Sequence, residues 1–412
     1  MIMTRIRRVL GFLIYLPNIM PFSALFSAEI FPWAFLYAMR KDNRLTLNYG
    51  IFLGYLIISS LIFFGSFSSF LVPARALFAL INASMIFFLL INISNKEYAI
   101  LTNIFHIVFT ANIVLCGVQF LGIFPSFLEP LFRIFIERFT HEIYGGGRGV
   151  AGLFAEPSYA SMAFHYYFAY FMLSKKINPK STIGIIAILG IIFFDLFIIR
   201  SVTGVIMIIL YLASLQKFRD LLKTGVVSIV ILVITVYNVG QSPNAPRSIE
   251  TAYDFFKYDV YQDPVPWLLE QSGFRFVSVW ASYKYGFTHP FGSGVGGWGP
   301  ASIQAMDDIG VKASAMSFFA SAMGSEYQGV RPTSFAAGLM LETGIVGLLL
   351  FILSFYPFII RRELYIDIHS RSVVIFFLFN IFALGSIGDP IPFIFLALAY
   401  RSVIEPNSRL NE

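Results

Sequence analysis

The feature that constrains this chain most is a series of apolar stretches, each close to the length of a membrane-spanning helix. About 20 apolar residues are needed to cross a hydrocarbon core of about 30 Å. The stretches that approach this length are 47–64, 76–93, 101–124, 151–173, 183–199, 202–215, 226–239 and 336–360. Charged residues make up 13% of the chain, against about 25% in ordinary soluble domains. The pattern excludes a cytosolic enzyme and a disordered protein, and predicts an all-α integral membrane protein. The single cysteine, Cys116, cannot form an internal disulfide.

Basic residues give the expected orientation. They cluster in alternate loops between the apolar stretches: Arg40, Lys41, Arg44, Lys175, Lys176, Lys180, Lys217, Arg219, Lys223, Arg361 and Arg362. Because lysine and arginine collect in cytoplasmic loops, we expect these loops in the cytoplasm. The net charge of +6 therefore does not indicate a nucleic-acid partner. The opposite side receives the segment 125–150 and the large loop 241–335.

Two further apolar stretches, 9–37 and 373–399, are too long for one span and short for two. Basic residues on both sides of each stretch favour tight helical hairpins, whereas length favours one tilted helix each. With hairpins, residues 1–412 form a single integral membrane domain of about twelve transmembrane helices, with eleven as the alternative number, and both termini are cytoplasmic. A signal peptide is the alternative at the N-terminus, but no clear small-x-small cleavage site follows the apolar run.

The first external segment, 125–150, has the pattern of an amphipathic helix lying in the membrane interface. Its apolar residues recur at helical spacing and would share one face: Phe132, Phe135, Ile136 and Phe139. Charged residues four apart would pair on another face: Glu129, Arg133 and Glu137. An ordinary external loop is the alternative interpretation.

Charged residues continue into the stretch that follows. Arg148 and Glu156 lie at the start of a segment whose other residues predict a transmembrane helix. Pro157 would break that helix beside Glu156. Charges inside a membrane are costly, so they indicate a functional site by default. The alternative is a structural Arg–Glu pair near the interface. His165, on the same stretch, is expected to be a packed polar residue.

The large loop 241–335 carries many aromatic residues, including Trp267, Trp280 and Trp298. We expect it to fold as short helices over the membrane portion. Its Gly292, Gly294 and Gly297 spell GxGxxG, but no strand–helix context supports a dinucleotide site. These glycines would instead let the backbone approach the membrane, another loop or a phosphate. Asp307 and Asp308 are expected to be solvated, and no metal site is predicted because no further ligand stands at suitable spacing.

Several arginines are expected at the external face: Arg148, Arg200, Arg275 and Arg331. Guanidinium groups bind phosphate oxygens in bidentate fashion, and aromatic faces suit sugar rings. Converging arginines near aromatic residues would therefore suit a pyrophosphate joined to a sugar. Arg200 has the alternative role of an interface anchor, and His289 is either a base or an ordinary loop histidine.

Four local motifs resemble those of the bacterial O-antigen polymerases (Wzy) and the related O-antigen ligases. Arg148 with the run 152–158 (GLFAEPS) is similar to the family's segment leading into a central span. Arg275 and Gly286 enclose ten residues, as in the polymerases' second periplasmic loop motif. His289 opens a turn similar to HP-x-G-x-G, and residues 341–347 (LETGIVG) resemble the E-x-G-I-x-G start of a late span. The matches run over about half of the chain.

The resemblance implies a multi-pass protein of the bacterial inner membrane with its active site facing the periplasm. Its reaction would transfer a growing glycan from polyprenyl pyrophosphate onto a repeat unit carried by a second polyprenyl pyrophosphate. By this resemblance, Arg275 and Arg148 would stabilise the charge of the leaving group. Glu156 is the first candidate for the general base, and His289 is the second. Substrate contacts are expected from Arg331, Arg200, Tyr159, Tyr283, Lys284, Trp280, Trp298, Gly292 and Gly294. The lipid tails would lie in a groove between spans, in contact with membrane lipids, and the sugars would lie under the aromatic loop. No metal or cofactor is implied, and a chain-length-regulating co-polymerase is an expected partner.

Two departures from the family pattern matter. Ligases carry a His ahead of the late Glu, whereas the equivalent residues 331–335 here read RPTSF, which favours a polymerase over a ligase. The first loop also lacks a clear Arg-x10-Gly motif, because position 159, eleven after Arg148, is Tyr. A lipid-linked oligosaccharide flippase is the alternative from another class. Transporters of this size often show two related halves, and no internal symmetry is visible in this sequence.

Overall fold

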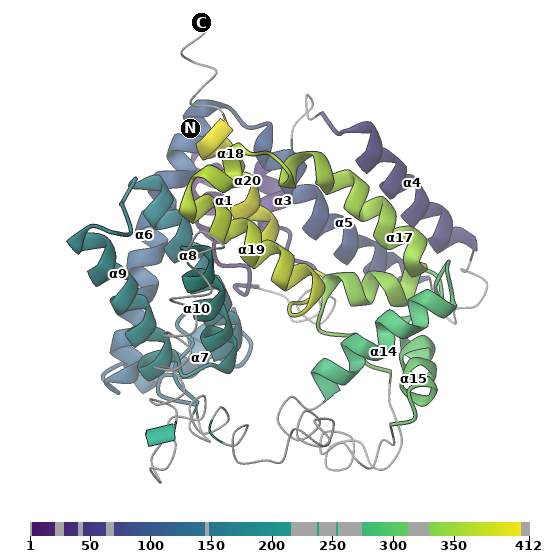
Figure 1. Ribbon diagram of the computed structural model, residues 1–412. Coiled ribbons are helices and arrows are strands. Elements are labelled where there is room, and N and C mark those ends of the chain that lie inside the picture. Colours follow the sequence, from purple (N-terminus) through teal and green to yellow (C-terminus); the bar gives the residue numbers. More distant parts are fainter. Residues whose placement is uncertain are drawn as a thin grey trace, which may run out of the picture.

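The computed structural model describes residues 2–20, 29–39, 44–62, 70–144, 148–215, 237–238, 253, 274–311 and 329–404. Every regular element in these ranges is helical (Figure 1), which confirms the predicted all-α class. The elements are α1 (Ile2–Leu13), α3 (Trp33–Ala38), α4 (Leu47–Ile62), α5 (Leu71–Ile91), α6 (Asn95–Phe120), η2 (Ser126–Leu128), α7 (Glu129–Arg133), α8 (Pro157–Ser174), α9 (Thr182–Phe193), η3 (Phe194–Ile199), α10 (Val202–Ser214), α14 (Phe274–Thr288), α15 (Trp298–Asp308), α17 (Phe335–Ile359), α18 (Glu363–Ile366), α19 (Ile368–Phe382) and α20 (Ile391–Ile404).

Some of these helices can cross a membrane. Among the described residues, four helical segments are long and apolar enough: α5, α6, the continuous α9–η3 segment Thr182–Ile199, and α17. Shorter apolar helices are α4, α10, α19 and α20. The chain is therefore embedded in a membrane, while the number of about twelve spans stays a prediction. The predicted span 226–239 lies outside the described residues, apart from positions 237 and 238.

The centre of the bundle is α8, which packs against α6, α10, α19 and α20. Its tyrosines Tyr166, Tyr167 and Tyr170 are fully buried, and their rings surround that of Phe395 on α20 at centroid distances of 5.8, 5.3 and 5.7 Å. A helix that is apolar and aromatic all round is one that neighbours cover on every side. The position of α8 matters for the site because the helix carries Glu156 at its start.

The segment before α8 corrects one prediction. Residues 151–156 are not helical, and α8 begins at Pro157. Gly152 has a φ of +60°, and the missing N–H of a proline suits the first position of a helix. The non-helical backbone is buried, and side chains of α6 satisfy it: Gly152 N donates to Gln119 Oε1 (2.9 Å) and Leu153 N to Asn112 Oδ1 (3.1 Å). Irregular backbone at membrane depth persists only where protein groups satisfy it in this way.

The predicted amphipathic helix of the first loop is also corrected. Helix α7 has only five residues, Glu129–Arg133, and turns follow it. Ile136 and Phe139 are buried within the protein, and Phe139 stacks on Phe132 at 4.7 Å, whereas the Phe135 side chain is exposed. The chain turns back after α7, and Arg133 Nε donates to the Phe139 carbonyl (2.9 Å). Tertiary contacts therefore replace a continuous helical face.

The stretch 373–399 is broken into two packed helices, α19 and α20, rather than one tilted helix. Asp389 and Pro390 lie between them, and Asp389 Oδ1 accepts a hydrogen bond from Ile391 N (3.0 Å) at the start of α20. The other ambiguous stretch contains α1 and α3, which pack together; its residues 21–28 lie outside the described part of the chain.

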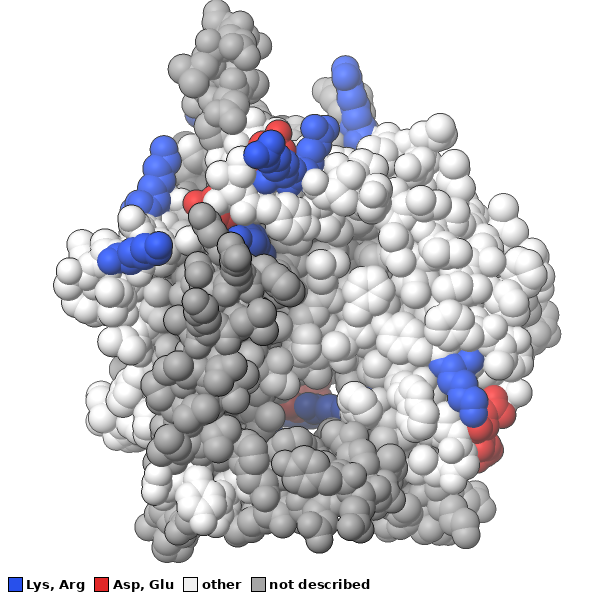
Figure 2. All heavy atoms as spheres, viewed as in Figure 1, with Lys and Arg blue, Asp and Glu red and all other residues white. Residues whose placement is uncertain are grey.

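The two ends of the bundle differ. Figure 1 places α7, α14 and α15 toward one end. Toward the other end it places α18 and the termini of the described part of the chain, which are the start of α1 and the end of α20. Basic residues gather along the edge nearest α18, and a hollow near the opposite end shows acidic and basic atoms at its base (Figure 2).

Candidate functional site

Glu156 stands at the N-terminal end of the buried helix α8. It is the N-cap residue of that helix, where the helix dipole favours a negative charge. Its carboxylate forms ion pairs with Arg138 and, at 3.8 Å from Oε2 to Nη2, with Arg275. The Glu156 side chain is 12% exposed, against 60% for Arg138 and 47% for Arg275. Both guanidinium groups can therefore still offer N–H donors to an anion arriving from outside.

Arg138 is the residue that sequence reasoning missed. It follows α7, and its φ of +64° lies in the left-handed region, where a side chain costs about 1–3 kcal/mol. The Tyr144 hydroxyl lies between the carbonyl oxygens of Arg138 and Ala155, 2.9 Å from the latter. Burial raises the pKa of Tyr144 to about 12, and the charge of Glu156 adds to the shift. Tyr144 is therefore a hydrogen-bond donor at neutral pH and ties the Arg138 backbone to the start of α8.

A spacing in the sequence could have identified Arg138. Ten residues separate Arg138 from Gly149, the same number that separates Arg275 from Gly286. Both glycines lie where backbone comes close to a membrane helix. A Cβ on Gly149 would stand 2.0 Å from the Ile198 carbonyl oxygen, and one on Gly286 would stand 2.7 Å from the Met340 carbonyl oxygen. Each glycine thus fixes its segment against the bundle, eleven positions after the arginine that meets Glu156. The motif sought from Arg148 is present, but it begins at Arg138.

A second charged cluster surrounds Arg331. Arg331 Nη2 lies 3.3 Å from Glu342 Oε1, and Nη1 lies 3.7 Å from Glu29 Oε2. Its guanidinium also covers the Trp298 ring at 5.3 Å. Glu342 is fully buried, and its Oε2 accepts a hydrogen bond from Gly296 N (3.0 Å). Burial raises the pKa of Glu29, and the Arg331 charge opposes that shift. Arg331 therefore links the N-terminal region, through Glu29, to α17, through Glu342. Glu342 in turn contacts the glycine-rich turn, residues 289–297.

Tyr159 connects the two clusters. Its hydroxyl is close enough to Glu156, Arg275, Glu29 and Asp389 to interact electrostatically with all four. Tyr159 lies one turn into α8, just past Glu156. The Glu156 and Arg331 clusters thus belong to one polar region at the end of the bundle away from the termini. Glu29 and Asp389 are further members that sequence reasoning missed, because each is a single acidic residue inside an ambiguous apolar stretch.

The glycine-rich turn packs on α17. Gly344 interrupts that helix with a φ of +64° and a ψ of −167°, and the carbonyl oxygen of Pro290 accepts from Val346 N (3.2 Å) beyond the interruption. A Cβ on Gly292 would stand 2.5 Å from the Glu342 backbone. The glycines were predicted to approach the membrane, another loop or a phosphate. In the structure Gly292 lies against the backbone of α17. Gly294, with a φ of +82°, lies in the same turn.

The remaining predicted site residues have local contacts. Tyr283 donates to the Phe382 carbonyl oxygen (2.7 Å), and Lys284 donates to that of Asp308 (2.7 Å). The His289 ring stacks on Tyr285 at 4.0 Å and caps its own helix. Trp280 is 48% exposed.

Two of the predicted arginines lie apart from Glu156. Arg200 lies over the Phe120 ring at 5.7 Å and donates to the Phe197 carbonyl (3.0 Å), as expected of an interface anchor. Arg148 is exposed, and Glu156 pairs with Arg138 and Arg275 instead.

Comparisons of the chain with protein-family models, with curated proteins and with solved structures found no match.

Proposed function

We propose that the chain is a lipid-linked glycan polymerase, and that Glu156 with Arg138 and Arg275 forms its transfer site. The donor is a growing glycan on polyprenyl pyrophosphate, and the acceptor is a repeat unit on a second carrier lipid, as the motif resemblance implies. The observation that carries the proposal is a carboxylate held between two half-exposed arginines at one end of a membrane bundle. Such a group suits a pyrophosphate leaving group beside a base.

In the proposed reaction, a hydroxyl of the acceptor sugar attacks the anomeric carbon of the donor. A new C–O bond forms as the bond between that carbon and the pyrophosphate oxygen breaks. Polyprenyl pyrophosphate leaves with the bonding electrons, and the hydroxyl proton passes to the Glu156 carboxylate. Glu156 suits the role of base because two neighbouring segments fix it and its side chain is mostly shielded from water.

Arg138 and Arg275 would bind the pyrophosphate. Negative charge grows on the leaving group as the bond breaks, and fixed guanidinium donors stabilise that charge. Loss of one such donor typically lowers kcat by about 100- to 1,000-fold. The same two side chains hold Glu156 before the anion arrives, so pyrophosphate binding would release the carboxylate to accept the proton.

We assign Arg331 a different role. Its side chain is 13% exposed and already faces two carboxylates, so it has little capacity left for a phosphate. It shapes the region next to Trp298 and Tyr159, whose aromatic faces and hydroxyl suit a sugar ring. In this proposal the site faces the periplasm from the bacterial inner membrane, because the basic loops lie at the other end.

The direct test is reconstitution of the purified protein with a single lipid-linked repeat unit, with products separated on a gel. A ladder of products is expected. Transfer that occurs only when lipid A–core is added would identify a ligase instead. Movement of the substrate across a vesicle membrane without chain growth would identify a transporter.

A further inference from the structure

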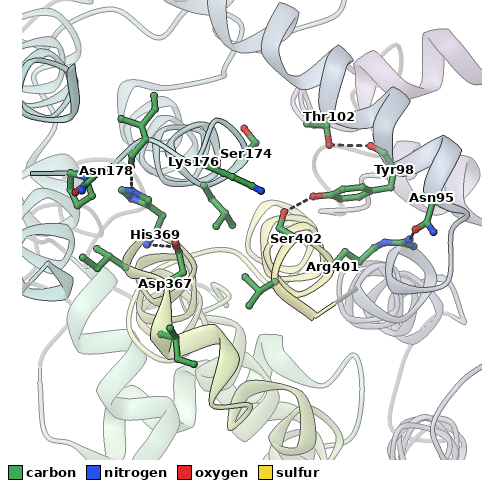
Figure 3. Close-up of a pocket in the computed structure, with 16 residues that line it drawn as sticks. Asn95, Tyr98, Thr102, Ser174, Lys176, Asn178, Asp367, His369, Arg401 and Ser402 are labelled. Atoms are coloured by element: carbon green, nitrogen blue, oxygen red, sulfur yellow. Dashed lines mark hydrogen bonds between the residues drawn. The ribbon is translucent and has the colours of Figure 1, made fainter. Parts of the chain in front are cut away.

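A pocket lies at the opposite end of the molecule from Glu156. Its volume is about 680 Å³, and it opens among the C-terminal ends of α8 and α20 and the N-terminal ends of α6 and α19 (Figure 3). Ligand sites in proteins typically have volumes of about 300–1,000 Å³. Part of the wall is apolar and comes from Leu173, Ile177, Ile366, Ile368 and Val403. The pocket is thus large enough for a ligand with both apolar and polar parts.

Most polar side chains around the pocket are engaged within the protein. Arg401 donates to the Ile91 carbonyl (3.2 Å) and to Asn95 Oδ1 (2.9 Å), and so closes the end of α5. His369 donates from Nε2 to the Ile177 carbonyl (2.9 Å), and its Nδ1 lies 3.2 Å from the Tyr211 hydroxyl. Both ring nitrogens therefore have partners within the protein. Asp367 Oδ1 caps α19 by accepting two backbone N–H groups.

Lys176 differs from these residues. Figure 3 shows its side chain directed into the pocket, toward the side where Tyr98 and Ser402 lie. Within the described part of the chain, no carboxylate lies within ion-pair distance of its ammonium group. Its φ of +51° lies in the left-handed region, at the position after a helix end that glycine usually occupies. Lys176 therefore has a backbone conformation that residues with side chains disfavour. Its charged group faces the cavity.

The charge around the pocket favours an anion. Lys176 and Arg401 are positive and Asp367 is negative, and Lys175 and Lys180 lie on the same loop. The apolar wall, together with helix ends at the edge of a membrane bundle, favours an amphiphile over a free ion. Basic pockets between helices near the cytoplasmic face typically bind anionic lipid head groups.

We propose that this pocket binds the phosphate of an anionic phospholipid head group, with Lys176 as the cation that pairs with it. The hydroxyl groups of Ser174, Tyr98 and Ser402 also line the pocket, but they already hydrogen-bond within the protein, so Lys176 is the group assigned to the phosphate. The proposal does not depend on the transferase activity, and it fits the end of the molecule that we assign to the cytoplasm.

The test measures the thermal unfolding of the purified full-length protein in detergent. Added phosphatidylglycerol is expected to raise Tm, and phosphatidylcholine with the same acyl chains is not. Lys176→Gly should unfold at the same temperature as the native protein or higher without lipid, because glycine suits the positive φ, and it should lose most of the phosphatidylglycerol shift. Lys176→Arg should keep the shift, since the positive charge remains.

Lys180→Gln is the matched control, because it removes a neighbouring exposed lysine that does not line the pocket. It should keep the shift. Equal losses in Lys176→Gly and Lys180→Gln would overturn the proposal, because they would indicate general surface charge. Stabilisation by glycerol phosphate at the same concentration, with none by phosphatidylglycerol, would assign the pocket to a soluble phosphate compound and overturn the lipid assignment.

Discussion

At the scale of single residues, the site consists of one carboxylate and two arginines that lie far apart in the sequence. Arg138 and Arg275 lie 137 positions apart in the chain, yet both reach Glu156. Glycines make this convergence possible. Gly149 and Gly286 each follow their arginine at the same spacing and let the backbone contact a membrane helix closely.

This close contact predicts an order of stabilities for glycine-to-alanine variants. Gly149→Ala places a methyl group 2.0 Å from a backbone oxygen, and Gly286→Ala places one at 2.7 Å. We expect both to destabilise the protein, by about 1–3 kcal/mol, with the larger effect at Gly149. Gly190 is the control: it is helical and nothing lies within 4 Å of its added Cβ, so Gly190→Ala should be neutral or stabilising by up to about 1 kcal/mol. Thermal unfolding in detergent measures the order, and a Gly149→Ala protein as stable as Gly190→Ala would contradict it.

At the scale of elements, α8, α17 and the turn between α19 and α20 bring the acidic residues of the site together. The apolar stretches of the sequence predicted these helices, because long runs of apolar residues are buried in a membrane or in a helix bundle. It did not predict where α8 begins, because the preceding buried backbone is held by Gln119 and Asn112 of another helix. It also overestimated the helix of the first loop, where Arg133 and Tyr144 make tertiary hydrogen bonds instead. Contacts of this kind leave no local signal in a sequence.

Asp389, in the turn before α20, is expected to make the stability of the folded protein depend on pH. Burial raises the pKa of Asp389 to about 7, and the nearby Glu29 adds to the shift. The folded state therefore binds this proton more tightly than the unfolded state. The resulting contribution to the free energy of unfolding is fully present at low pH and is lost as pH rises through about 7, by up to about 1.4 kcal/mol per pH unit. Asp389→Asn should keep the hydrogen bond from Ile391 N. It should therefore exceed the native protein in stability at pH 8, with the difference shrinking toward pH 4.

Unfolding of both proteins across this pH range checks the prediction. A stability difference that is the same at pH 5 and pH 8 would contradict the assignment of a buried, proton-binding Asp389.

At the scale of the whole molecule, the two ends of the bundle are chemically different. One end carries α18, basic residues and the pocket around Lys176; the other carries the Glu156 and Arg331 clusters. Composition predicted the membrane class, whereas the external position of the arginines stays a prediction from loop charge. Composition and loop charge do not distinguish Arg138 from exposed Arg148 on the same loop; the spacing from Arg138 to Gly149 does, and it is Arg138 that pairs with Glu156.

The proposed orientation can be measured by cysteine labelling. The native chain has one cysteine, Cys116, which is buried in α6, so background labelling should be low. Phe127→Cys in η2 replaces a residue that is 77% exposed, and Ile366→Cys in α18 replaces one that is 71% exposed. A membrane-impermeant maleimide should label Phe127→Cys on intact spheroplasts, and Ile366→Cys only after the membrane is opened. The reverse pattern would place the Glu156 site in the cytoplasm.

In the proposed function, Arg138 and Arg275, together with Glu156, form the transfer site. The measurement that tests it most directly is the rate of ladder formation by purified, folded Arg138→Gln, Arg275→Gln and Arg148→Gln proteins on one lipid-linked repeat unit. Arg138→Gln and Arg275→Gln should each be slower than the native protein by about 100-fold or more, and Arg148→Gln should be slowed less than either. A folded Arg138→Gln protein that makes ladders at the native rate, while Arg148→Gln does not, would contradict the account.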